Sequence, residues 1–352
     1  MADEKEKVSS ALKEIKYPGF SRDIVSFGIV KDVEIHSDCV KVHLGFTTSN
    51  DDVIEQIKNA VSKKMSALTD KKIILEVRRM QEKTVKEEAD VYADRLPIPN
   101  VKYVLAIGSG KGGVGKTTVA VNLAVSLAKR NASVGLLDAD IYGPNVSIML
   151  GINDYDPTVK EGTKLMPYNK YGINVMSIGF FISLDSPVIW RGPMVHRMLM
   201  QFLRNVEWGN LDFLVVDLPP GTGDAQLTLV QKVPISGAII VTTPQDVSLV
   251  DARKGLKMFE SVNVPVLGIV ENMSYLQCPH CGRRIDVFRA GGGKRTAMEL
   301  GVPLLAEIPI DPNMSVISDA GIPVVESDSG SLHSKLFFSL ADQVMKKIGY
   351  IQ

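Results

Sequence analysis

The sequence predicts an α/β protein in which a doubly wound, mostly parallel sheet follows a smaller α+β domain. From Val101 onward, short and continuously apolar runs alternate with helical patterns, which is typical of a parallel sheet covered by helices on both faces. Before that point, helix and strand patterns are mixed within a segment of ordinary domain size. A chain of 352 residues with 45% apolar residues can bury two separate cores.

The small domain is expected to span residues 1–80. Its predicted elements, in order, are a helix over 4–15, strands over Ile24–Val33 and Val40–Phe46, a helix that begins at Asp51-Asp52, and a strand over Lys71–Met80. Residues 81–100 are rich first in charge and then in proline, a composition that favours an extended linker.

The larger domain is expected to span residues 101–352. Its predicted strands are Val101–Ile107, Ser133–Leu137, Leu211–Asp217, Gly237–Val241 and Val264–Val270. A helix is predicted over Thr117–Lys129, and the stretch Leu332–Ile348 has an apolar face at helical spacing. We interpret that face as core packing rather than membrane binding, because the polar face of the stretch is not strongly cationic.

Composition narrows the classes of protein that fit. Lysine plus arginine and aspartate plus glutamate each number 40, so net charge gives no reason to expect a nucleic-acid partner. The three cysteines are too few, and odd in number, to form a disulfide framework, so they favour a reducing compartment. No signal peptide is expected at the start, and no run approaches the roughly 20 apolar residues of a membrane helix. We therefore expect a cytoplasmic protein with neither a nucleic-acid nor a membrane partner.

A phosphate-binding loop is the strongest motif in the chain. Gly110, Gly115, Lys116 and Thr117 match the pattern G-x-x-x-x-G-K-[ST] between a predicted buried strand and a predicted helix. Inward-turned amide groups and the positive end of the helix would line an anion site there, whereas a glycine-rich turn with a chance Lys-Thr is the alternative. The predicted ATP-binding residues are Gly110, Lys111, Gly112, Gly113, Val114, Gly115, Lys116, Thr117 and Thr118. Lys116 is expected to reach the β- and γ-phosphates, and the hydroxyl of Thr117 to bind Mg²⁺.

Aspartates follow two of the predicted strands. Asp138 and Asp140 come after one strand, and Asp217 ends another. Carboxylates at these ends lie at the ligand edge of an open α/β sheet. Asp217 is expected to hold Mg²⁺ directly or through water, and the glycine-hinged loop Leu218–Asp224 to respond to the γ-phosphate. A helix N-cap is the alternative role for Asp138 and Asp140.

Cys278 and Cys281 form a Cys-x-x-Cys pair that can place two sulfur ligands on one ion or cluster. Structural zinc ions and cubane clusters need about four ligands. The remaining cysteine, Cys39, lies in the other predicted domain within a strand-like segment, which favours a buried apolar role. The missing ligands most simply come from a second copy of the chain. The residues alone leave open a [4Fe–4S] cluster, a zinc ion, and a redox-active or inert dithiol.

The segment Lys111-Gly-Gly-Val-Gly-Lys-Thr117 resembles the deviant Walker A motif of the ATPases that include nitrogenase iron protein, MinD, ParA and the Mrp/ApbC scaffolds. The resemblance implies a P-loop NTPase fold and a homodimer in which Lys111 reaches the nucleotide of the other subunit. It also implies that Asp140 orients the attacking water and that Asp138 supports the metal shell. The implied catalytic residues are Lys111, Lys116, Asp140 and Asp217, and Asn272, Pro309 and Asp311 are implied to lie on the adenine side.

Three further segments are similar to signatures of the Mrp/ApbC branch: Asp217–Asp224, Trp190–Met194 and Glu271–Tyr275. The resemblance implies an ATP-hydrolysing carrier that holds a [4Fe–4S] cluster between two subunits at Cys278 and Cys281 and transfers it to apo iron–sulfur proteins, with scaffold proteins as possible donors.

The first domain resembles the small iron–sulfur assembly domain fused to some members of this branch. Its segment Phe46–Asp51 has no cysteine, so we expect a docking or regulatory role there. The alternative for the whole chain is a MinD/ParA-like positioning ATPase with a structural zinc site.

Overall fold

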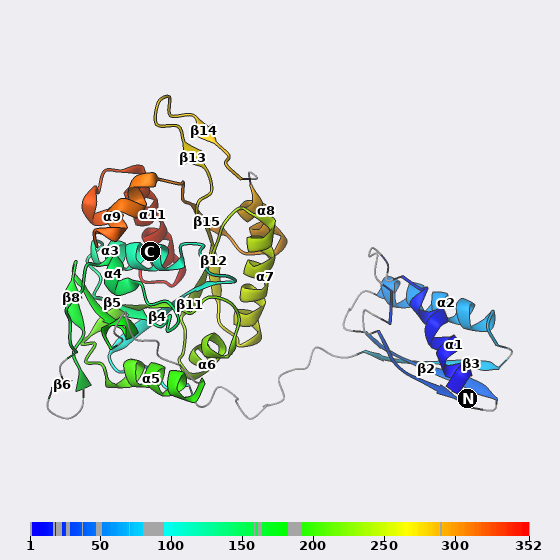
Figure 1. Cartoon of the computed structure of the whole chain (residues 1–352). Helices are drawn as coiled ribbons and strands as arrows, with labels where there is room; N and C mark the ends of the chain where they lie inside the picture. Colours follow the sequence, from blue (N-terminus) through cyan, green and yellow to red (C-terminus); the bar gives the residue numbers. More distant parts are fainter. Residues whose placement is uncertain are drawn as a thin grey trace. The chain divides into compact units, whose positions relative to one another are not determined.

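The chain divides into two compact units, Met1–Val91 and Tyr92–Gln352, in the computed structural model (Figure 1). The residues that the structure describes are 2–16, 18, 23–25, 29–36, 38–46, 51–69, 71–79, 95–157, 159–160, 164–181, 192–288 and 291–351. Residues 47–50, most of the predicted linker and the Trp190-Arg191 part of one signature segment lie outside that set.

The first unit packs two helices on a three-stranded sheet. Its elements are α1 (Ala2–Lys13), β1 (Val30–Ile35), β2 (Cys39–Phe46), α2 (Asp51–Ser66) and β3 (Lys72–Arg79). β1 is antiparallel to β2, and β2 is parallel to β3. Apolar residues at helical spacing, such as Val8 and Leu12 on α1 and Ile57 and Val61 on α2, are buried against the strands. Cys39 is buried at the start of β2, as predicted.

The predicted strand over Ile24–Val33 is wrong at its start. Ile24 lies in a turn, where its N–H donates to the carbonyl oxygen of Ile15 over 2.9 Å. The side chain of Asp23 accepts a hydrogen bond from the N–H of Val25 over 3.0 Å. An aspartate that binds the backbone two residues later favours a turn over a strand. The strand therefore begins only at Val30.

The second unit contains an eight-stranded sheet in the order β15-β12-β11-β4-β10-β5-β9-β8. Its strands are β4 (Val101–Ser109), β5 (Val134–Asp138), β8 (Tyr168–Lys170), β9 (Ile173–Ser177), β10 (Leu211–Asp217), β11 (Gly237–Thr242), β12 (Val266–Glu271) and β15 (Leu304–Glu307). Seven of them run parallel, and β8 is antiparallel to β9. Two small pairs lie outside this sheet: β6 (Val159–Lys160) with β7 (Lys164–Leu165), and β13 (Leu276–Gln277) with β14 (Arg284–Ile285).

Helices cover both faces of this sheet, so the predicted doubly wound α/β fold is confirmed (Figure 1). They are α3 (Lys116–Ala128), α4 (Val146–Met149), α5 (Gly192–Asn205), α6 (Asp224–Lys232), α7 (Asp246–Ser261), α8 (Gly292–Glu299), α9 (Pro312–Asp319), α10 (Val324–Ser327) and α11 (Leu332–Lys347), with a 3₁₀ turn at Ile178–Phe180. One core lies beneath α3 and α11, and the other beneath α5, α6 and α7.

The apolar face of α11 packs into the core, as the sequence predicted. Phe337, Leu340 and Val344 are fully buried against the sheet and α3. Among the described residues, no helix is long and apolar enough to cross a bilayer.

Candidate functional site: a nucleotide pocket and a cysteine hairpin

Three adjacent parallel strands bring the predicted site residues together. β10 lies between β4 and β5, and Asp217 pairs in register with Ile107 on one side and Asp138 on the other. The glycine-rich loop leaves β4 at this same end. Because the carboxyl ends of parallel strands meet at one edge of a sheet, residues more than a hundred positions apart share a single site there.

The glycine-rich loop leads directly into α3, and its last glycine is required by its surroundings. Gly115 stands at the N-cap with φ of +79°, a conformation that favours glycine. A Cβ atom on Gly115 would lie 2.1 Å from the side-chain nitrogen Nδ2 of Asn272, and one on Gly110 would lie 2.2 Å from the backbone of Asp251. The sequence pattern is therefore also a packing requirement at these two positions.

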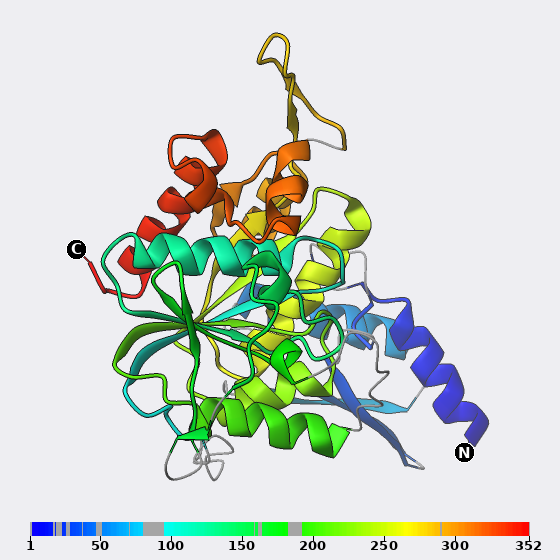
Figure 2. The same cartoon turned by 60° about the vertical axis from the view of Figure 1, so that its left-hand side comes forward.

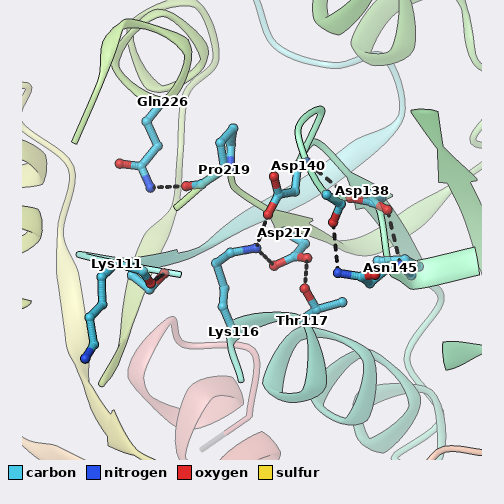
Figure 3. Close-up of polar contacts among 12 residues, drawn as sticks. Lys111, Lys116, Thr117, Asp138, Asp140, Asn145, Asp217, Pro219 and Gln226 are labelled. Carbon is cyan, nitrogen blue, oxygen red and sulfur yellow. Dashed lines mark hydrogen bonds and ion pairs between the residues drawn. The ribbon is translucent and has the colours of Figure 1, made fainter. Parts of the chain in front are cut away.

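Lys116 is the centre of a buried polar cluster at the floor of the loop (Figure 3). Its Nζ lies 2.6 Å from Oδ1 of Asp217 and 3.4 Å from Oδ2 of Asp140. The hydroxyl of Thr117 donates to Oδ2 of Asp217 over 2.7 Å. The Lys116 residue is 6% exposed and Asp217 is fully buried, so these charges interact in a largely water-free environment.

Asp138 is held by three donors around the loop that carries Asp140. It accepts from the N–H of Asp140 (3.1 Å), the N–H of Val146 (3.3 Å) and the hydroxyl of Ser177 (2.8 Å). Val146 is the first residue of α4, so the carboxylate also binds the start of that helix without being its N-cap residue. These contacts fix the loop after β5.

Burial and crowded negative charge shift the ionisation of this cluster. Burial raises the pKa of the Asp138 carboxyl to about 7, and the nearby Asp217 carboxylate adds to the rise. Burial also raises the pKa of Asp140, although the Lys116 ammonium opposes that rise. For Lys116, burial lowers the pKa, but the surrounding carboxylates outweigh it and the net shift is upward. One oxygen of Asp140, Oδ1, is buried without a hydrogen-bond partner among the described residues.

An open cavity of about 500 Å³ lies over this floor, within the size range of small-molecule sites. The predicted residues that line it are Lys111, Gly112, Gly113, Gly115, Lys116, Thr117, Thr118, Asp140, Asn272, Pro309 and Asp311. Val114, Asp138 and Asp217 are buried around it. The far wall comes from α4 and α9, through residues such as Met149 and Met314.

Asn272 and Asp311 have structural partners in the cavity wall. The Nδ2 of Asn272 donates to the carbonyl oxygen of Val114 over 3.0 Å, which ties the end of β12 to the glycine-rich loop. Asp311 caps α9 by accepting from the N–H of Asn313 over 2.9 Å. His333, 7% exposed, binds the carbonyl oxygen of Pro309 through Nε2 over 3.1 Å.

The side chain of Lys111 points away from the cluster around Lys116 (Figure 3). Its backbone carbonyl accepts from the hydroxyl of Ser109 over 2.9 Å, so the loop is fixed while the ammonium group lies outside the floor of its own site.

Two buried polar residues of this region are absent from the sequence predictions. Ser177, at the end of β9, donates to Asp138 across 39 positions of the chain. Gln226 on α6 donates through Nε2 to the carbonyl oxygen of Pro219 over 2.8 Å and so holds the glycine-hinged loop (Figure 3). Neither residue belongs to a motif, and no signal in the sequence marks them.

The two predicted metal-binding cysteines lie on a hairpin that projects from the unit (Figures 1 and 2). β13 and β14 form its stem, and the N–H of Cys278 donates to the carbonyl oxygen of Arg283 over 2.9 Å. The turn closes at Gly282, with φ of +69°. Cys278 is half-buried, Cys281 is exposed, and both are free thiols.

The chemistry of the hairpin favours a thiolate ligand. Hydrogen bonds from the backbone of His280 and Cys281, and from the Cys281 side chain, lower the pKa of the Cys278 thiol. Within the described part of the chain, no three histidine, cysteine or acidic side chains are grouped so that they could hold a metal ion. A single chain therefore offers a tetrahedral metal or cluster only two sulfur ligands here.

We expect Gly115→Ala to lower the affinity for ATP by at least about tenfold, or ~1.4 kcal/mol, because the added Cβ meets Asn272. Isothermal titration calorimetry with MgATP measures this. Gly301→Ala is the matched control: its φ is +67°, but the described residues place no atom within 4 Å of the added Cβ. It should cost about 1–2 kcal/mol of stability and leave ATP affinity unchanged. Wild-type affinity in Gly115→Ala would contradict the expected clash.

Asp138 should make the nucleotide-free, metal-free protein less stable as the pH rises. Its folded pKa of about 7 exceeds the unfolded value of about 3.9. The contribution of Asp138 to the free energy of unfolding is therefore complete below the unfolded pKa, and it is lost as the pH rises through the folded pKa. Asp138→Asn should flatten this fall in the free energy of unfolding.

Urea unfolding at about pH 5 and about pH 7.5 covers most of the pH range over which this stability is lost. Trp190 and Trp208 both belong to the second unit, so tryptophan fluorescence follows its unfolding. Asp319→Asn, at an exposed position, should keep the wild-type dependence. Equal slopes for the wild type and Asp138→Asn would contradict the assignment.

Comparison with known proteins agrees with this geometry. Residues 100–345 match the family described as ParA, NUBPL iron-transfer P-loop NTPase, and residues 5–74 match the family described as iron-sulfur cluster assembly protein. A Synechocystis protein named iron-sulfur cluster carrier protein is 44% identical in an alignment of 349 positions that covers 97% of each chain. The Arabidopsis thaliana iron-sulfur protein required for NADH dehydrogenase, mitochondrial, is 50% identical over 252 residues, 71% of this chain and 80% of that protein.

Solved structures show the same fold for the second unit. A nucleotide-binding protein from Archaeoglobus fulgidus in complex with ADP is 39% identical. The match covers 68% of this chain and 93% of the Archaeoglobus chain, with a TM-score of 0.58. The cell division ATPase MinD of Pyrococcus furiosus is 26% identical. Its match covers 70% of this chain and 99% of the MinD chain, with a TM-score of 0.52. Both the predicted resemblance and the predicted fold are confirmed, and the chain is a member of the ParA-type family of NUBPL iron-transfer P-loop NTPases.

Proposed function

We propose that this protein binds and slowly hydrolyses ATP and carries a [4Fe–4S] cluster that two copies of the chain hold together and deliver to apo-proteins. One observation carries the proposal. Two free cysteines, Cys278 and Cys281, lie on a projecting hairpin of a P-loop NTPase unit and can supply half of the ligands that a cubane cluster needs.

The position of the cysteines suits a cluster that must leave. A structural zinc site is closed by four protein ligands, whereas this pair is accessible to a second copy or to an acceptor. Two hairpins across a two-fold axis would bring four thiolates together. The lowered pKa of the Cys278 thiol favours the thiolate form that binds iron. Two free thiols, one of them exposed, also suit a reducing compartment such as the cytoplasm.

The nucleotide cavity supports ATP hydrolysis. The loop amides and Lys116 would hold the β- and γ-phosphates, and Asp140 would orient a water molecule towards the γ-phosphorus. Attack by the water forms a new P–O bond, breaks the bond to ADP and yields phosphate, with the proton of the water passing to solvent or to Asp140. Most of this catalysis is positioning and charge stabilisation. Lys111, whose side chain points away from the cluster around Lys116 (Figure 3), would act on the nucleotide of the partner copy.

Magnesium fits the residues at the floor. Thr117 and Asp217 offer hydroxyl and carboxylate oxygens side by side, 2.7 Å apart, and oxygen is the ligand that Mg²⁺ prefers. In the part of the chain that the structure describes, the buried Oδ1 of Asp140 has no hydrogen-bond partner. Three carboxyl groups also lie near the single ammonium group of Lys116, an arrangement that would favour an added cation. Bound there, Mg²⁺ would neutralise phosphate charge, and Asp138 would support it by fixing the loop that carries Asp140.

The first unit supports a role in docking or regulation. Residues 5–74 match an iron–sulfur assembly family, yet their only cysteine, Cys39, is buried in β2. This unit would contact donor scaffold proteins or apo-protein clients instead of binding the cluster itself.

Anaerobic reconstitution with iron and sulfide tests the carrier role. We expect broad visible absorption, about four iron atoms per two chains, and a dimeric mass by light scattering. Cys278→Ala and Cys281→Ala should abolish both the absorption and the iron. Cys39→Ala, which removes the only other cysteine, should retain them. A colourless protein with about half a zinc ion per chain, or a loaded protein that stays monomeric, would overturn the proposal.

Asp140→Asn tests the hydrolytic site. We expect the rate of phosphate release to fall by about 10²-fold or more, while MgATP still binds, because the glycine-rich loop and Lys116 are unchanged. Asp319→Asn provides the control, since Asp319 lines the same cavity on α9, away from the glycine-rich loop. Hydrolysis at the wild-type rate in Asp140→Asn would exclude Asp140 from the reaction.

A further inference from the structure

The cysteine hairpin is rooted in the wall of the nucleotide cavity. Asn272 and Met273 line the cavity, and Cys278 follows six positions after Asn272. We call residues 271–276 the strap and residues 307–311 the pocket wall, because Pro309, Ile310 and Asp311 line the same cavity. The strap is therefore the covalent path from the nucleotide to the hairpin.

Backbone hydrogen bonds join the strap to the pocket wall along its length. The N–H of Ile308 donates to the carbonyl oxygen of Glu271 over 2.8 Å. The carbonyl oxygen of Ile308 in turn accepts from the N–H of Ser274 over 2.9 Å. The N–H of Ile310 then donates to the carbonyl oxygen of Tyr275 over 2.6 Å. Leu276 bridges to Ile310 on this side and pairs with Ile285 of the hairpin on the other. The wall and the stem of the hairpin thus form one hydrogen-bonded ladder.

The nucleotide end of the strap is held in a strained conformation. Met273 has φ of +54°, which is uncommon for a residue with a long side chain and costs about 1–3 kcal/mol. It follows Asn272, whose side chain binds the carbonyl oxygen of Val114 in the glycine-rich loop. A segment kept under strain between two contacts of the cavity can relax when either contact changes.

A side-chain cluster fixes the hairpin end. The guanidinium of Arg284 on β14 stacks 4.1 Å from the ring centroid of Tyr275, and its Nη2 lies 3.6 Å from Oε1 of Glu307. Ser274 links the same group inward: its hydroxyl lies 3.4 Å from Oε1 of Glu307 and 2.6 Å from Oε1 of Glu271. Glu271 is fully buried and accepts from the N–H of Gly293 in α8. Arg284 therefore joins the hairpin to both the strap and the pocket wall.

The geometry points to the strap as the element that transmits nucleotide occupancy to the cysteine hairpin, with Arg284 as the positioning residue that makes the hairpin follow the pocket wall. ATP would replace or reorient the contact between Asn272 and Val114 and press on the wall at Pro309–Asp311. The ladder and Arg284 would carry that shift to the stem of the hairpin. The inference rests on the proposed function only in assuming that the hairpin holds the cargo.

Hydrogen–deuterium exchange on the full chain without a cluster tests the coupling. In the wild type, saturating MgATP should change the exchange rates of residues 276–288 by about fivefold, the low end of typical coupling between linked sites. Arg284→Gln should lose most of this response, although ATP binds and is hydrolysed as before. Arg283→Gln, at an exposed position of the same hairpin, should keep the full response. Arg284→Lys retains the charge without the planar stacking group and should respond weakly.

Two outcomes would overturn the inference: a full response in Arg284→Gln, or unchanged exchange at the hairpin of the wild type when calorimetry shows that ATP is bound. Light scattering at the same protein concentration checks that the variants have the same oligomeric mass as the wild type. The experiment needs no cluster, so a failure to carry iron and a failure of this coupling are separate results.

Discussion

A buried ion pair between Lys116 and Asp217 joins the start of α3 to the carboxyl end of β10. Asp138 and Asp140 lie beside this pair, so one ammonium group faces three carboxyl groups in a region with little water. Removing charges from water is costly unless each is matched. Burial, and after it the nearby Asp217 carboxylate, raises the pKa of Asp138. In the proposed nucleotide site, an added cation would offset the negative charge of these carboxylates and would in turn attract a phosphate chain.

The topology of the sheet makes this cluster possible and also explains why the sequence could predict it. Strands buried on both faces are continuously apolar, so β10 was predicted with its observed bounds, Leu211–Asp217. Since parallel strands end at one edge, placing Lys116, Asp138 and Asp217 after such strands was enough to place them together. Local sequence failed where a turn interrupts an apolar run: Ile24 is fully buried yet lies outside β1.

Tertiary contacts without a local pattern could not be predicted. Ser177 reaches Asp138 only because β9 lies next to β5, and the strands of the hairpin are two residues long, too short for any periodicity. Asn272 is a similar case. The family resemblance predicts that Asn272 lies on the adenine side of the nucleotide. Its hydrogen bond to Val114 and its close approach to Gly115 depend instead on the packing of β12 against the glycine-rich loop.

A carrier must hold its cargo firmly and still release it, and in the proposed function the two-ligand hairpin together with the strap would address both demands. With half a site per chain, the affinity for the cluster would depend on the contact between two copies, so a movement of the hairpins would change that affinity steeply. Linkage then acts in both directions: if ATP alters cluster affinity through the strap, cluster binding alters ATP affinity by the same factor. Met273, with its strained φ, lies between Asn272 and the root of the hairpin. It is therefore in the segment through which ATP and the cluster would affect each other's affinity.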